Sequence, residues 1–200
     1  QGVSWHKILP PKTNSKGKPY KDCHARRCYL HLHYLSSGNT DFLTKQSAIG
    51  TIVANGNVGE RLDITKTSLF LSRDGGLSWK ELRKRSHIFN VGNNGSIILI
   101  SPKDQLVTDI SYTIDEGNTF NSVTVSSVPI RVDKIVNLNN SLSFIVYGSD
   151  LTIHNQHESG VIIGLNFTNV FERECLNPEF AGSITSDYEL WSPHSDSASG

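Results

Sequence analysis

Two sets of residues in this 200-residue sequence could carry chemistry, and the first combines cysteine with histidine. It comprises Cys23, His24, Cys28, His31 and His33. Thiolate and imidazole ligands of this kind can hold a tetrahedral zinc ion, and His31 and His33 would share one face of a strand. The two cysteines could instead form a disulfide, which is the simpler arrangement and leaves the histidines as ordinary strand residues.

The second set consists of two aspartates that occupy the same position in a repeated pattern. Asp74 lies in residues 72–79 (SRDGGLSW) and Asp115 lies 41 residues later in residues 113–120 (TIDEGNTF). Residues 2–5 (GVSW) match the last four positions of a third copy. Paired carboxylates can hydrolyse glycosidic bonds, and many sialidases carry this pattern. A glycan hydrolase or lectin of the sialidase-like propeller type is therefore one interpretation.

The repeated pattern also has an architectural interpretation. A tight turn between strands needs a residue with positive φ, which Gly76 and Gly117 can supply. The Asp and Ser/Thr oxygens can accept hydrogen bonds from turn amides, and the aromatic residue can anchor the hairpin in the core. The pattern is known as the Asp box, and we predict a structural role for its residues: Ser72, Asp74, Gly76, Trp79, Thr113, Asp115, Gly117 and Phe120.

Short β-rich segments surround the boxes, and helical periodicity is nearly absent. They are rich in Val, Ile, Leu, Phe and Thr and are separated by Gly, Asn, Asp or Ser, which is typical of antiparallel strands. We expect strands at 28–35, 50–54, 68–72, 88–92, 96–100, 107–114, 120–126, 130–136, 142–147 and 161–167. A spacing of about 40 residues between boxes is what one four-stranded blade consumes. The sequence therefore predicts an all-β β-propeller, with about three blades in this chain.

Composition and charge narrow the class of protein. The formal net charge is zero and the basic residues form no long run, so we predict no nucleic-acid partner. No apolar stretch reaches the length of a transmembrane helix. Sequons at Asn94, Asn139 and Asn166, together with the closely spaced cysteine pair, indicate N-glycosylation in an oxidising secretory compartment. Cys175 is left over, which suggests a partner cysteine outside this segment.

Several segments resemble, in the right order, one family of receptors. Residues 28–33 (CYLHLH) resemble the Cys-x-Leu-His-x-His strand of sortilin and the vacuolar protein-sorting receptors. Residues 56–59 (GNVG) resemble the family's turn that leads into the next blade. The resemblance covers residues 2–193, and Pro10-Pro11 with the lysines that follow look more fungal than animal. Further landmarks lie at residues 87–89, 92–95, 129–133, 171–175 and 187–191.

The resemblance implies a ten-bladed luminal propeller, of which residues 1–191 would form the C-terminal blades and closing segment. It favours a disulfide between Cys23 and Cys28 over a metal site, and it pairs Cys175 with a cysteine outside this chain. It implies no enzyme, no metal and no cofactor. The implied function is that of a type I sorting receptor, which binds soluble cargo proteins or peptides in the Golgi and delivers them to the endosome, vacuole or lysosome.

The remaining expectations concern the surroundings of these blades. Because the sequence begins inside a box repeat, we expect the N-terminal part of the same propeller as a partner, in the lumen of the trans-Golgi and endosomal system. Membrane attachment would come only through an anchor that is absent from this chain. We expect a polar insertion at about residues 12–22, a flexible tail at 192–200, and surface or loop positions for His87, His154 and His157. The sequence names no ligand-binding residue.

Overall fold

The computed structural model describes residues 6–21, 23, 27–33, 42–44, 48–150 and 159–171. The chain divides into a compact unit Gln1–Asn166 and a second unit Phe167–Gly200, whose described part contains the 3-10 helix η3 (Thr168–Val170). The third box copy at residues 2–5, His24, His154, His157, Cys175 and the tail at 192–200 lie outside the described residues. None of the described residues belongs to a helix with the length and apolar character needed to cross a membrane.

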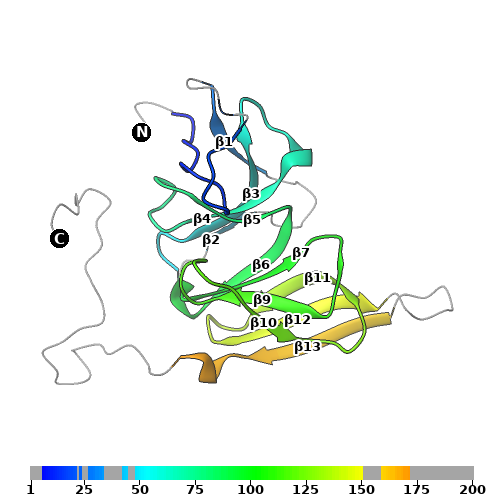
Figure 1. Ribbon diagram of the computed structural model, residues 1–200. Helices are drawn as coiled ribbons and strands as arrows, with labels where there is room; N and C mark the ends of the chain where they lie inside the picture. The colour runs from blue at the N-terminus through cyan, green and yellow to red at the C-terminus, as the bar shows by residue number, and fades with distance from the viewer. Residues whose placement is uncertain are drawn as a thin grey trace, which may run out of the picture. The chain divides into compact units, whose positions relative to one another are not determined.

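The first unit contains three antiparallel sheets, which we call A, B and C in chain order (Figure 1). Sheet A has the strand order β1-β3-β4-β5, with β2 also paired to β3. Its strands are β1 (Tyr29–Leu32), β2 (Phe42–Thr44), β3 (Ile52–Gly59), β4 (Ser68–Ser72) and β5 (Lys80–Lys84), and η1 (Ile64–Lys66) connects β3 to β4. The first Asp box is the connection between β4 and β5.

Sheets B and C repeat this arrangement along the chain. Sheet B has the order β6-β7-β9-β10, and the second Asp box connects β9 to β10. Sheet C has the order β8-β11-β12-β13, because the short strand β8 pairs with β11. The bounds are β6 (His87–Gly92), η2 (Asn93–Gly95), β7 (Ile97–Pro102), β8 (Leu106–Val107), β9 (Asp109–Thr113), β10 (Asn121–Thr124), β11 (Ile130–Asn137), β12 (Ser143–Asp150) and β13 (Ser159–Asn166). The all-β prediction is confirmed.

Two apolar clusters lie on the two faces of sheet A. Alternation along β4 sends Leu69 and Leu71 to one face and Phe70 to the other. The first face packs against sheet B, and the second face carries Trp79 of the Asp box. The cluster between sheets A and B contains Ala48, Val53, Leu69, Leu71, Leu82, Phe89, Val91, Ile98 and Ile100. The cluster on the other face contains Leu30, Ala54, Phe70 and Trp79.

Polar side chains from the interior of two strands join neighbouring sheets. The Asn55 side chain of β3 is fully buried; its Nδ2 donates to the His87 carbonyl (2.8 Å) and its Oδ1 accepts from the His87 amide (3.0 Å). The Asn90 Nδ2 of sheet B donates in the same way to the Ile135 carbonyl of sheet C (2.8 Å). One asparagine thus connects sheet A to sheet B, and another connects sheet B to sheet C.

One expectation about the fold is wrong. Residues 56–59, which resemble a turn between blades, form the second half of β3 and pair with β1. Gly56 pairs with both Leu32 and Ser68 in this central strand. A Cβ at Gly56 would lie 2.6 Å from the carbonyl oxygen of His31. The glycine therefore permits a close approach of two strands and does not make a turn.

Candidate functional site

The first Asp box closes its turn with side-chain hydrogen bonds. The Asp74 Oδ1 accepts from the Ser72 hydroxyl (2.8 Å) and the Ser78 amide (2.9 Å), and its Oδ2 accepts from the Ser78 hydroxyl (2.5 Å). The Ser72 hydroxyl in turn accepts from the Gly76 amide (2.8 Å). Trp79 is only 7% exposed, and its Nε1 donates to the Gly76 carbonyl (3.0 Å).

The second Asp box repeats this geometry with threonine in place of serine. The Asp115 carboxylate accepts from the Thr113 hydroxyl (2.8 Å), the Thr119 amide (2.9 Å) and the Thr119 hydroxyl (2.6 Å). The Thr113 hydroxyl accepts from the Gly117 amide (2.8 Å). Phe120 is half-buried, packs against the core between sheets A and B, and lies 4.1 Å under the Arg83 guanidinium.

The two boxes also contact each other across sheets A and B. The Arg73 Nε pairs with Glu116 Oε1 (3.1 Å), while its Nη1 donates to Thr51 Oγ1 (2.7 Å) and to the Gly95 carbonyl (3.1 Å). A Cβ at the second box's Gly117 would collide with the side chain of Leu82 in β5, so the second turn packs closely against sheet A. This arrangement supports the structural interpretation, because both carboxylates are engaged inside their own turns and lie in different sheets.

Replacing either box aspartate with alanine should destabilise the fold. Asp74→Ala and Asp115→Ala each remove the acceptor of three or more turn hydrogen bonds, and we expect the free energy of unfolding to fall by about 1–2 kcal/mol. Urea unfolding followed by tryptophan fluorescence measures both. A variant that keeps full stability and loses ligand binding would contradict the structural role.

Acid should weaken the same turns. Hydrogen bonds from Thr119 lower the pKa of Asp115 to about 2, while for Asp74 the hydrogen bonds from Ser78 and Ser72 outweigh burial and also lower its pKa. Both carboxylates bind a proton less tightly in the folded state than in the unfolded state. Their contribution to the stability of the fold is therefore complete above about pH 4 and is lost as the pH falls toward about 2. As the pH falls through this range, the free energy of unfolding should fall less steeply for Asp115→Asn than for the wild type. An equal fall in both proteins would exclude Asp115 as a source of the acid sensitivity.

The cysteine and histidine cluster does not form a metal site in the described residues. Cys23 and Cys28 are joined by a disulfide with a Cα–Cα distance of 5.0 Å. The His31 Nε2 lies 3.2 Å from the Gly59 carbonyl, and the buried His33 contacts Asn57 Oδ1 through Nε2 (3.0 Å). Within the described part of the chain, no three His, Cys, Asp or Glu residues are arranged to hold a metal ion.

The expected surface position of His87 is wrong. His87 begins β6 and is 8% exposed, and its Nδ1 lies 3.0 Å from the Arg85 carbonyl. Burial lowers the pKa of His87 below its ordinary value. Its sequence context, in which charged residues precede it, did not reveal that its backbone is bonded to Asn55.

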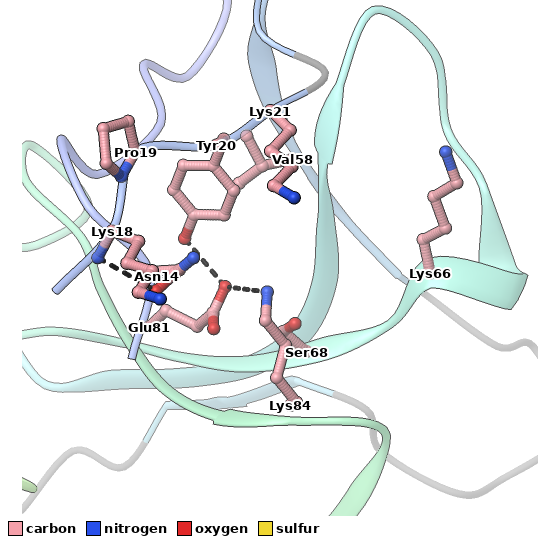
Figure 2. Close-up of a pocket in the computed structure, with 10 residues that line it drawn as sticks. All are labelled: Asn14, Lys18, Pro19, Tyr20, Lys21, Val58, Lys66, Ser68, Glu81 and Lys84. Atoms are coloured by element: carbon pink, nitrogen blue, oxygen red, sulfur yellow. Dashed lines mark hydrogen bonds and ion pairs between the residues drawn. The ribbon is translucent and has the colours of Figure 1, made fainter. Parts of the chain in front are cut away.

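A pocket that the sequence did not predict lies where residues 14–21 cross sheet A (Figure 2). Its volume is about 240 Å³. Residues from the expected insertion form one wall, and β3, β4, β5 and η1 supply the rest. The lining residues are Asn14, Lys18, Pro19, Tyr20, Lys21, Val58, Lys66, Ser68, Glu81 and Lys84.

Glu81 fixes the wall of this pocket to β5. Its side chain is 0% exposed, and its Oε1 accepts from the Ser15 amide (3.1 Å) and hydroxyl (2.9 Å). Its Oε2 accepts from the Tyr20 hydroxyl (2.8 Å) and the Lys84 ammonium (2.9 Å), which Figure 2 shows converging on it. Burial and the neighbouring Glu81 raise the pKa of Tyr20, so its hydroxyl remains a donor.

The three sequon asparagines lie on the surface. Asn94, Asn139 and Asn166 are all exposed. Asn94 has a φ of 55°, and its Oδ1 accepts from the Asn140 side-chain amide (2.6 Å), while its own amide donates to Asn140 Oδ1 (3.0 Å). These bonds use the Asn94 oxygen, which leaves its Nδ2 atom outside the pair.

Comparison with known proteins gives two family matches that together cover the chain. Residues 1–135 match the family described as sortilin, neurotensin receptor 3 (Sortilin-Vps10). Residues 136–200 match the family described as sortilin, neurotensin receptor 3, C-terminal (Sortilin_C). The first match alone covers more than half of the chain, and it includes both Asp boxes and the pocket.

Curated relatives agree with these matches. The chain is 33% identical over 200 residues to the vacuolar protein sorting/targeting protein 10 of Debaryomyces hansenii, covering 96% of this chain and 12% of that protein. It is 29% identical over 205 residues to the protein of that name from Aspergillus terreus (96% and 13%) and 33% over 202 residues to that from Mycosarcoma maydis (98% and 13%). The chain thus spans about an eighth of its relatives' length, and it belongs to the sortilin and Vps10 family.

Proposed function

We propose that this chain is part of the ligand-binding propeller of a type I sorting receptor, which binds soluble cargo proteins or peptides in the Golgi and delivers them to the endosome, vacuole or lysosome. The match of residues 1–135 to the Sortilin-Vps10 family carries this proposal. The relatives are named for vacuolar protein sorting and targeting, and their family is not one of enzymes. The carboxylates of Asp74 and Asp115 are engaged in hydrogen bonds within their own turns, so neither is available as a catalytic acid or base. This supports a binding role over a hydrolytic one.

The proposed location is the lumen of the trans-Golgi and endosomal system. A disulfide between Cys23 and Cys28 and three exposed sequons support an oxidising, glycosylating compartment. We also propose that residues 1–191 belong to a larger, ten-bladed ring, that Cys175 pairs outside this chain, and that the N-terminal part of the same propeller is a partner. An anchor outside this chain would supply membrane attachment.

At least one sequon should carry a glycan when the chain passes through a eukaryotic secretory pathway. Asn94 is the first candidate, because it is exposed in a turn and its Nδ2 atom lies outside the pair with Asn140. Intact-mass spectrometry before and after enzymatic deglycosylation should reveal the glycan. Asn94→Gln should lower the mass of the glycosylated protein by the mass of one glycan. Secreted protein with all three sites unoccupied would contradict this prediction.

Capture of cargo by the full-length gene product tests the proposed function. Crosslinked immunoprecipitates should be enriched in precursors of soluble vacuolar proteins relative to bulk secreted glycoproteins. Enzymatic removal of N-glycans from the cargo should leave this capture unchanged if the protein surface is recognised. Equal capture of all glycoproteins, lost on deglycosylation, would instead support the lectin interpretation.

A further inference from the structure

We propose that Asn94 is a deamidation site, where the protein converts an asparagine without any enzyme to aspartate and isoaspartate. The reaction needs an asparagine followed by a residue with an unhindered backbone amide, which glycine supplies because it has no Cβ. The sequence contains two such dipeptides, Asn55-Gly56 and Asn94-Gly95. The structure places them in opposite surroundings. The inference goes beyond the proposed receptor function and does not depend on it.

The chemistry uses only the groups of this turn and water. The Gly95 backbone nitrogen gives up its proton to solvent hydroxide and attacks the Asn94 Cγ, and the Asn94 Nδ2 leaves as ammonia to close a cyclic succinimide. Water then opens the ring. Addition at Cγ gives aspartate, and addition at the backbone carbonyl carbon gives isoaspartate, whose main chain continues through the former side chain. The net reaction exchanges an amide for a carboxylate, with no oxidant or reductant.

Asn55-Gly56 is protected by its place in the middle of sheet A. The Asn55 side chain is fully buried, and its two polar atoms bond to the backbone of His87 at 2.8 and 3.0 Å. Gly56 pairs with Leu32 of β1 and with Ser68 of β4. Attack by the Gly56 nitrogen would therefore require β3 to leave both neighbouring strands, which costs a large part of the stability of the fold.

Asn94-Gly95 instead lies in the turn between β6 and β7, at the end of sheet B. Asn94 is exposed, and its Nδ2 atom lies outside the pair with Asn140, so the leaving nitrogen faces no bond within that pair. Opening of residues 93–96 leaves the two strands paired, because their ladder ends at Gly92 and Ile97. A turn at the end of a sheet opens at a lower free energy than a central strand.

Contacts with both neighbouring sheets hold the turn closed and should set the rate. The Asn94 ψ of 25° turns the Gly95 nitrogen away from the Asn94 Cγ, so the turn must open before the ring can close. Arg73 of sheet A donates from Nη1 to the Gly95 carbonyl (3.1 Å). Asn140 of sheet C bonds to Asn94 twice, at 2.6 and 3.0 Å. Loss of the Asn140 side chain should therefore speed the reaction.

Glycosylation and deamidation of Asn94 exclude each other. Both involve Nδ2: a glycan attached there removes the free amide that leaves as ammonia, and a deamidated residue has no side-chain nitrogen to accept a sugar. Copies of the chain that escape glycosylation at Asn94 are then the ones that deamidate. Isoaspartate would also displace the groups that bond to Asn140, so these copies should unfold at a lower urea concentration.

Peptide mapping of the unglycosylated chain tests the inference. Wild-type chain from the bacterial periplasm, where disulfides form, would be incubated folded at mildly alkaline pH and then digested in heavy-oxygen water, which labels any conversion during digestion. Asn94 should convert at least about tenfold faster than Asn55, since a difference of about 1.4 kcal/mol in opening free energy already gives that ratio. Exposed Asn121, which serine follows, should also be slower than Asn94.

Two alanine variants in one turn isolate the contribution of the pair with Asn140. Asn140→Ala should accelerate conversion of Asn94 about fivefold, which corresponds to about 1 kcal/mol of lost hydrogen bonding. Asn139→Ala is the matched control, because Asn139 also has a positive φ (48° against 55°) and lies outside the pair; its effect should stay below about twofold.

The rates decide between the two accounts of Asn94. Conversion of Asn94 no faster than that of Asn55 or Asn121, or conversion seen only after the chain is unfolded in urea, would overturn the assignment of the site. Equal rates in Asn140→Ala and Asn139→Ala would overturn the claim that the pair with Asn140 holds the turn closed.

Discussion

Asn55→Ala should lower the free energy of unfolding by about 2–4 kcal/mol. The Asn55 side chain satisfies both backbone groups of His87 in the next sheet, at 2.8 and 3.0 Å, and it is fully buried. Alanine would leave a buried amide and a buried carbonyl without these partners, and each such group costs about 1–3 kcal/mol. Denaturant unfolding monitored by far-UV circular dichroism measures the loss.

Two further variants define the cause of that loss. Asn121→Ala changes an exposed strand asparagine, and we expect its effect to stay within about 0.5 kcal/mol. Asn55→Asp keeps an acceptor for the His87 amide but loses the donor to the His87 carbonyl, so it should destabilise about as much as alanine. If Asn55→Ala were as mild as Asn121→Ala, the bond between sheets A and B would be incidental.

Glu81→Ala should cost about 2–4 kcal/mol and release residues 14–21 from sheet A. The buried carboxylate accepts two bonds from Ser15, one from Tyr20 and one from Lys84. Its removal leaves these donors without their acceptor, and breaking a buried charged network is strongly destabilising. The estimate stays below that for a fully buried pair, because Lys84 is 49% exposed.

Limited trypsin digestion measures directly whether residues 14–21 are released from sheet A. Cleavage after Lys16 or Lys21 should accelerate roughly tenfold or more in Glu81→Ala, since cleavage follows the population of the open form. Tyr20→Phe is the matched milder change, because it removes one hydroxyl donor and keeps the ring, and it should cost about 1 kcal/mol. Unchanged cleavage in Glu81→Ala would show that Glu81 does not hold this segment.

The family, the all-β propeller fold and the position of the hairpins were predictable because their signals are local. An Asp box places a turn residue, an acceptor and an anchor within eight positions, and both copies occupy strand connections. The strand expected at 68–72 is β4 with the same bounds. These confirmed predictions depend on residues whose partners are near in sequence, as in the bond from Ser78 to Asp74.

What the sequence did not predict depends on partners that are distant along the chain. Glu81 bonds to residues 61 and 66 positions away, and Asn55 bonds to a residue 32 positions away. Strand β5 escaped prediction because its sequence KELRK is mostly charged, and an irregular register with β4 at Leu69/Phe70 breaks the alternation. The only sign of such a long-range contact in the sequence was a polar residue beside apolar neighbours, as with Asn55 after residues 52–54.

Localisation of soluble vacuolar proteins tests the central claim most directly. In cells that carry the gene for this chain, the gene would be disrupted. Pulse-chase and immunoprecipitation would then measure the fraction of each soluble vacuolar protein whose precursor appears in the medium. A sorting receptor predicts that precursors are secreted after disruption and retained again when the intact gene is restored. Soluble vacuolar proteins that all reach the vacuole in unchanged amounts without the gene would contradict the proposed role.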